Sequence, residues 1–180
     1  MLDFSKNYFE LFGLPAGYRV NADELAHRYR ELQSEVHPDR FAHGSEQEKR
    51  VAMQGSTHLN EALETLKDPI LRGHYLLTLY GLEMDVTANT QDAAFLMEQL
   101  ELREELAEAK KAPDPYAVTD RIRGEVRKRS ELFMEQLATL FENPGPEQLA
   151  AAREILSKMQ FLQKLRHDAE LLEAELDEEI

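Results

Sequence analysis

The chain has 180 residues, a formal net charge of −14 and no cysteine. Without thiols it can form no disulfide, cysteine nucleophile or cysteine-held zinc or iron–sulfur cluster; this fits a reducing compartment, and we expect a cytoplasmic protein. We expect no secretory leader, because no basic-then-apolar pattern opens the chain, and no membrane partner, because no apolar stretch is long enough to span a bilayer. The negative charge disfavours nucleic acid as a partner.

The first part of the chain predicts a helical hairpin. A short helix over residues 8–12 stops at a Gly-Leu-Pro break, and Asn21 is placed to cap a second helix that continues to Val36. The apolar positions of this second helix recur at helical spacing, at Leu25, Tyr29, Leu32 and Val36. Pro38 cannot continue it, so a polar loop over 39–44 should follow.

Two further helices are expected before the pattern changes. Ser45 with Glu48 three residues later is the signature of a capping box, which predicts the start of a third helix. Its apolar face would use Val51, Leu59, Ala62, Leu63 and Leu66. Asp68-Pro69 has the order of a cap and a first-turn proline, and it opens a fourth helix. We therefore assign residues 1–80 to one domain and residues 81–90 to a linker.

The rest of the chain, residues 91–180, predicts a three-helix domain. Helices are expected over about 91–111, 115–142 and 146–177, because prolines stand at the joints between them. Three helices of similar length with short joints favour an antiparallel bundle. Most of the charge lies after residue 80, −11 for residues 81–180 against −3 for the first 80 residues. The predicted fold class is all-α.

His37-Pro38-Asp39 is the first feature that indicates a function. A tripeptide this short occurs often by chance, and one interpretation is a turn that ends a helix, with the aspartate capping the next segment. Its position between two amphipathic helices favours a different interpretation. The tip of a rigid hairpin would then present a ring and a carboxylate to a cationic partner.

With these flanking helices, residues 7–80 resemble a J-domain, the module that docks on ATP-driven chaperones of the DnaK class and stimulates their ATP hydrolysis. The resemblance rests on Asn7–Pro15 at the start and on Leu66–Pro69 with Arg72 and Tyr75 at the end. It implies a helical hairpin with short flanking helices. It also implies a set of chaperone-binding residues: His37, Pro38, Asp39, Arg28, Arg30 and Arg40. Arg40 stands where many J-domains carry a lysine.

The helix that follows the linker carries two apolar faces. Successive residues of a helix are rotated by about 100°, and this rotation brings one group of apolar residues into a stripe that is wide enough for a core contact. It consists of Phe95, Leu102 and Leu106. The other face carries Leu96, Met97 and Leu100, with Glu101, Glu104 and Glu108 on or beside it. This second face either packs inside the bundle or forms an acid-rimmed docking surface on the outside.

Residues 95–106 and Phe161–Leu165 resemble the HscB family, the J-proteins dedicated to iron–sulfur cluster assembly. The resemblance implies that the second domain binds the scaffold protein IscU, and that the first domain engages the chaperone HscA and stimulates its ATPase. It also implies a set of scaffold-binding residues: Leu96, Met97, Leu100, Glu101, Glu104 and Phe161. Phe161 flanks two leucines, so it could equally belong to the core.

The sequence predicts no enzyme, metal site or cofactor. The histidines lack the paired helical spacing of zinc ligands, and no phosphate-binding loop or nucleophile elbow occurs. A basic run is interpreted as a solvated helix face; it consists of Arg121, Arg123, Arg127, Lys128 and Arg129. Two alternatives remain open, a J-domain co-chaperone for a different client and an acidic helical adaptor unrelated to chaperones.

Overall fold

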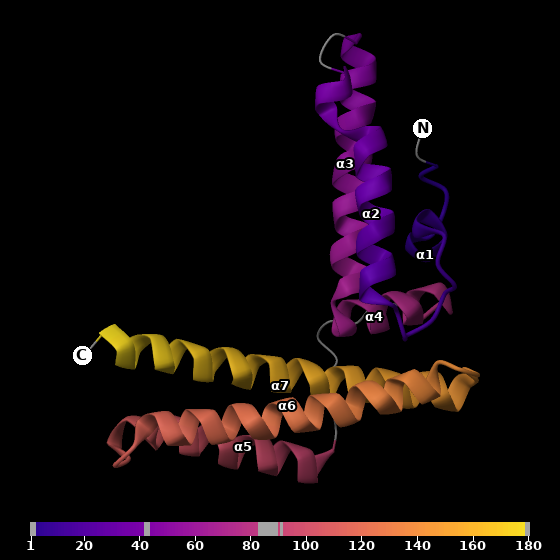
Figure 1. Cartoon of the computed structure of the whole chain (residues 1–180). Coiled ribbons are helices and arrows are strands. Elements are labelled where there is room, and N and C mark those ends of the chain that lie inside the picture. Colours follow the sequence, from indigo (N-terminus) through magenta and orange to yellow (C-terminus); the bar gives the residue numbers. More distant parts are fainter. Residues whose placement is uncertain (1–2, 42–43, 83–89, 91, 179–180) are drawn as a thin grey trace. The chain divides into compact units, whose positions relative to one another are not determined.

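The computed structural model describes residues 3–41, 44–82, 90 and 92–178 of the chain (Figure 1). These residues form seven α-helices and two short 3-10 helices, with no strand among them, which confirms the all-α fold class. Contacts group the chain into two compact units, Met1–Met84 and Asp85–Ile180. Of the helices described, none is both long enough and apolar enough to cross a bilayer.

The first unit is built on a hairpin of α2 (Ala22–Val36) and α3 (Glu46–Lys67), which lie side by side in Figure 1. Both helices begin where the sequence predicts. The Asn21 side chain accepts hydrogen bonds from the first turn of α2, and Ser45 forms a complete capping box with Glu48. The Tyr29 hydroxyl donates to the Asn60 side chain at 2.8 Å and joins the two helices.

Two shorter helices, α1 (Tyr8–Phe12) and α4 (Pro69–Leu79), pack on this hairpin. Gly13 ends α1 with a φ of 66°, a left-handed conformation that favours glycine. The Tyr8 ring stacks on Tyr75 with 4.5 Å between the ring centroids, and the Tyr8 N–H donates to the Tyr75 hydroxyl at 2.9 Å. The most deeply buried side chains of the unit come from all four helices: Phe9, Phe12, Leu25, Leu59, Leu66 and Leu76.

The second unit is a bundle of α5 (Ala93–Glu108), α6 (Pro115–Leu140) and α7 (Pro146–Glu178). A 3-10 turn, η2 (Ala109–Lys111), replaces the last turn expected for α5. Figure 1 shows α6 running antiparallel to both α5 and α7. The core is mainly apolar along all three helices and includes Phe95, Leu106, Ile122, Val126, Leu137, Leu156, Leu162 and Leu165. The three-helix bundle predicted from the sequence is confirmed.

Candidate docking sites

The connection between α2 and α3 begins with a 3-10 turn, η1 (Pro38–Phe41), where the sequence predicts an open loop. His37 is the last residue before this turn, with an extended backbone and an exposed side chain, as a residue preceding proline should be. The Arg40 N–H donates to the His37 carbonyl at 3.0 Å and closes the turn. The side chains of Pro38 and Asp39, and residues 42–43 of the expected loop, lie outside the described part of the chain.

Arg40 connects this turn to the end of α2. Its Nη1 donates to the Ser34 carbonyl at 3.0 Å, and this carbonyl is among the last four of the helix, which have no partner within it. A cation at a helix C-terminus is also favourable for the helix dipole. Arg40 therefore has a positioning role in addition to the chaperone contact that the sequence predicts, and sequence reasoning missed it.

Arg28 and Arg30 project from different sides of α2, because two helical steps separate them by about 200°. Arg28 forms an ion pair with Glu31 at 3.4 Å. Arg30 precedes His37 by about two turns and so lies on the same side of the hairpin as that histidine. By helical spacing, Arg30 and not Arg28 shares the side of His37.

The second apolar face of α5 is on the surface of the bundle. Phe95 and Leu106, on the other stripe, are 3% and 7% exposed. The second face is far more accessible, with exposed fractions of 37% for Leu96, 62% for Met97 and 53% for Leu100. These three residues are called the docking face below. Their exposure shows that the face is not packed inside the bundle, and its docking role stays a prediction.

The carboxylates of α5 fall into two groups. Glu98 forms an ion pair with Arg129, Glu105 with Arg121, and Glu108 with Lys111 at 2.8 Å, so each of these three charges is neutralised. Glu101 and Glu104 are exposed, and within the residues that the structure describes neither forms an ion pair. The docking face is therefore bordered by two uncompensated negative charges.

Phe161 of α7 is half-buried against α5. Its ring packs edge-on against Phe95, with 6.2 Å between the centroids, and Phe95 also contacts Phe133 at 6.3 Å. Such aromatic contacts add to the burial of the rings. Phe161 thus contributes to the core and keeps part of its surface accessible, whereas the sequence offered these two roles as alternatives.

Asp92 fixes the start of α5. Its carboxylate accepts a hydrogen bond from the Phe95 N–H at 3.1 Å and one from the Lys158 ammonium at 2.6 Å. The Lys158 hydrogen bond, followed by the Phe95 N–H, holds the pKa of Asp92 below its ordinary value. The same ammonium lies 5.6 Å from the centre of the Phe95 ring. The first turn of α5 is therefore anchored on α7 beside the docking face.

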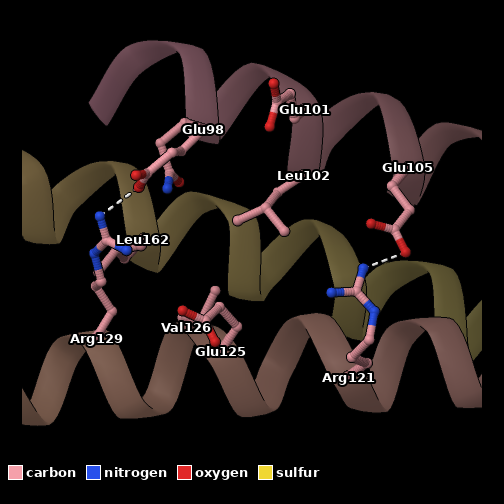
Figure 2. A pocket seen from close by; sticks show the side chains of 10 residues that line it. Glu98, Glu101, Leu102, Glu105, Arg121, Glu125, Val126, Arg129 and Leu162 are labelled. Carbon is pink, nitrogen blue, oxygen red and sulfur yellow. Dashed lines mark hydrogen bonds and ion pairs between the residues drawn. The ribbon is translucent and has the colours of Figure 1, made fainter. Parts of the chain in front are cut away.

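A cleft of about 290 Å³ lies between α5 and α6 (Figure 2). The ion pairs of Glu98 with Arg129 and of Glu105 with Arg121 cross it. A third arginine, Arg123, bonds Glu173 of α7 at 2.8 Å. The basic run of α6 is thus only partly the solvated face that the sequence indicated, since three of its five members join neighbouring helices. The similar spacing of Glu98 and Glu105 on α5 and of Arg121 and Arg129 on α6 is compatible with two such pairs, but it does not fix the offset between the helices.

Gln99 also lines this cleft, and sequence reasoning missed it. It is only 5% exposed, and its Oε1 has no hydrogen-bond partner within the described structure. The helical spacing that places Phe95 and Leu106 in the core also places Gln99 there, because it lies within about 40° of both. A polar residue on the apolar stripe is the signal that could have identified it.

Among the described residues, no three His, Asp or Glu side chains gather closely enough to hold a metal ion. His27 lies 3.5 Å from Glu31 on the surface of α2, and His74 is buried in α4. The His58 ring packs against Phe4 and Tyr8.

Comparison with known proteins places these features in a family. Residues 91–170 match the family model described as the HSCB C-terminal oligomerisation domain. The chaperone HscB from Vibrio cholerae is 38% identical, with a TM-score of 0.80 over 95% of this chain and 99% of that one. The human co-chaperone protein HscB is 34% identical, with a TM-score of 0.83, and the match covers 95% of this chain and 84% of the human one. The Jac1 co-chaperone from Saccharomyces cerevisiae is 26% identical, with a TM-score of 0.71, and the match covers 93% of this chain and 94% of the yeast one.

The fold and the matches together define the class of protein. A helical hairpin with His-Pro-Asp at its tip and a separate helical bundle on the same chain make it a co-chaperone with an N-terminal J-domain. The chain belongs to the HscB family.

Proposed function

We propose that this co-chaperone binds the iron–sulfur scaffold protein IscU through the docking face and delivers it to the DnaK-class chaperone HscA. Through the His37-Pro38-Asp39 turn it stimulates the ATPase of HscA, and so assists the assembly and transfer of iron–sulfur clusters. The hydrolytic chemistry belongs to the chaperone, so this chain acts as an adaptor and not as an enzyme. We place the activity in the cytoplasm, the compartment that the cysteine-free composition favours.

The exposed docking face is the observation that carries this proposal. Leu96, Met97 and Leu100 lie together on one side of α5, and each keeps a third or more of its surface exposed. Covering such apolar surface by a partner is favourable, in proportion to the area removed from water. A methionine in such a face adapts to the shape of the surface that covers it. Glu101 and Glu104 border the face and favour a partner with basic residues at the matching positions.

The two units give the proposal its mechanism. The scaffold held on α5 is brought to a high effective concentration near a chaperone that is bound by the hairpin of the same chain. His37 is exposed where α2 ends, and the turn that follows it is fixed to that helix by Arg40. This rigid presentation suits a contact that has to favour one conformation of the ATPase over another.

An ATPase assay with HscA, IscU and the whole chain tests the proposal. We expect the chain and IscU together to stimulate hydrolysis more than the sum of their separate effects. His37→Gln should abolish the stimulation. Leu96→Ser with Leu100→Ser should remove the synergy with IscU and retain the stimulation by the chain alone. Leu132→Ser with Leu171→Ser is the matched control, because these leucines are 54% and 50% exposed on α6 and α7.

The possible failures separate the alternatives. If the double variant at Leu96 and Leu100 binds IscU as tightly as the unmodified chain, the docking face serves another client. If His37→Gln stimulates the ATPase normally, or if no stimulation occurs at all, the protein is an acidic helical adaptor and the turn has only a structural role.

A further inference from the structure

The α5–α6 cleft contains more negative charge than its own cations neutralise. Four carboxylates line it, from Glu98, Glu101 and Glu105 of α5 and Glu125 of α6 (Figure 2). Arg129 and Arg121 neutralise Glu98 and Glu105. Glu101 and Glu125 form no ion pair within the described residues, so the cleft keeps two uncompensated charges. Charge balance thus favours one further cation.

Gln99 is a second and independent observation at the same place. Gln99 is 5% exposed and lines the cleft, and its Oε1 receives no hydrogen bond within the described residues. Leaving a buried carbonyl unsatisfied costs about 1–3 kcal/mol. The cleft arginines, Arg121 and Arg129, are directed at Glu105 and Glu98, and neither donates to this oxygen. The oxygen itself has almost no exposed surface, so a donor in the cleft satisfies it once the Gln99 side chain turns toward the opening.

The base of the cleft is apolar. Leu102 is half-buried, and Val126 and Leu162 are 3% and 1% exposed. A side chain with a hydrocarbon stem and a charged end matches this combination, because the stem packs on the apolar base while the charged end reaches the carboxylates. Glu101 belongs both to the cleft and to the border of the docking face, so a partner that covers this face lies next to the cleft.

We propose that the α5–α6 cleft is a subsite for one arginine side chain of the protein that docks on α5, an inference that rests on the proposed docking there. The guanidinium would donate to the free carboxylates Glu101 and Glu125 and to the Gln99 Oε1. Arginine fits better than lysine, because its planar fork donates to several oxygens at once and is more weakly hydrated. The apolar contacts of the docking face would supply most of the buried area of the complex. The arginine in the cleft would fix the register of the partner along α5.

A titration without any partner protein tests the subsite directly. The whole chain is titrated with N-acetyl-arginine methylamide, and the side-chain amide of Gln99 is followed by NMR. The citrulline analogue is the control, because it has nearly the same shape and donors but no charge. We expect a saturating shift at Gln99 with the arginine compound and none with citrulline. Equal shifts with both compounds, or shifts with arginine only outside the cleft, would overturn the proposal.

Variants then test whether the subsite is used in docking. Glu125→Gln removes one cleft carboxylate and leaves the docking face unchanged, and Glu131→Gln makes the same change at an exposed position of α6 outside the cleft. We expect Glu125→Gln to weaken binding of IscU about fivefold, as for loss of about 1 kcal/mol, and Glu131→Gln to have no effect.

The two proposals fail in different ways. If Leu96→Ser with Leu100→Ser abolishes binding of IscU while Glu125→Gln leaves it unchanged, the docking face is correct and the cleft proposal is wrong. If IscU does not bind at all, the proposed function is wrong. The arginine titration then still decides whether the cleft takes a guanidinium group.

Discussion

Asp92 combines three roles at the scale of a single residue. Its carboxylate caps the first turn of α5, accepts a hydrogen bond from Lys158 of α7, and stays ionised because of both. A carboxylate whose pKa is lowered by folding stabilises the protein above the ordinary aspartate value, and this contribution is lost as the pH falls through the lowered pKa. The anchor of α5 is therefore intact at neutral pH and is released only in acid.

Lys158→Met tests this anchor. The substitution removes the hydrogen bond that lowers the pKa of Asp92 most, so that pKa should rise toward its ordinary value. The first turn of α5 should also exchange its amide protons faster. NMR titration of the Asp92 carboxyl group measures the first effect. Lys164→Met, an exposed lysine of the same helix, is the control, and an Asp92 titration that Lys158→Met leaves unchanged would contradict the assignment.

At the scale of the elements, one aspartate joins two helices of the first unit. Asp68 ends α3 with an N–H that donates to the Glu64 carbonyl, and its side chain begins α4 by accepting from the Ile70 and Leu71 N–H groups at 2.8 Å each. The Arg72 side chain then donates to the Leu66 carbonyl at 2.5 Å across the same corner. The direction of α4 on the hairpin is thus set by local hydrogen bonds.

Asp68→Ala should lower the free energy of unfolding by about 1 kcal/mol, the usual cost of losing an N-cap. Asp68→Asn should keep most of the stability, because its amide oxygen accepts the same two hydrogen bonds. Urea denaturation of both variants measures the difference. Equal destabilisation by Ala and Asn would show that charge, and not capping, is what matters at this corner.

The helices were predictable where local chemistry defines them. Asn21, Ser45 and Asp68 cap helices at the expected residues, because a cap depends only on the few residues that follow it. The exposure of the docking face was less predictable from the sequence. Helical spacing separates Leu96 and Leu100 from Phe95, but whether α6 or α7 covers that side depends on how three helices pack.

Contacts between helices account for most of what the sequence did not reveal. The pairing of Arg121 with Glu105 depends on the offset of α6 along α5, and no local pattern fixes that offset. The contact of Arg40 with the Ser34 carbonyl depends on a 3-10 turn where an open loop was expected. Phe161 is half-buried because one edge of its ring meets Phe95, and a pattern of apolar residues does not distinguish this from full burial.

At the scale of the whole molecule, charge is divided unequally along the chain. Residues 81–180 carry −11 of the net charge of −14, and they include the helix proposed to bind the scaffold. The electrostatic attraction of exposed charges reaches over the screening length, which is about 10 Å at 0.1 M ionic strength and about 3 Å at 1 M. The proposed capture of a basic surface should therefore depend on salt.

We expect the rate of association with IscU to fall roughly tenfold between these two ionic strengths, because steering by the acidic unit is lost. The dissociation rate should change less, since the apolar contacts of Leu96, Met97 and Leu100 hold the complex once formed. Stopped-flow fluorescence measures both rates. An association rate that does not change with salt would show that the excess negative charge has no part in capture.

The anchoring of α5 has a consequence for how a partner is recognised. The helix is capped at Asp92, packed through Phe95 and Leu106, and joined to α6 by two ion pairs, all within this chain. Its backbone entropy has thus already been lost in folding, and a complex forms without a further penalty for ordering a segment. The proposed docking on this helix should therefore join preformed surfaces, so that the geometry of the two surfaces, and not induced folding, selects the partner.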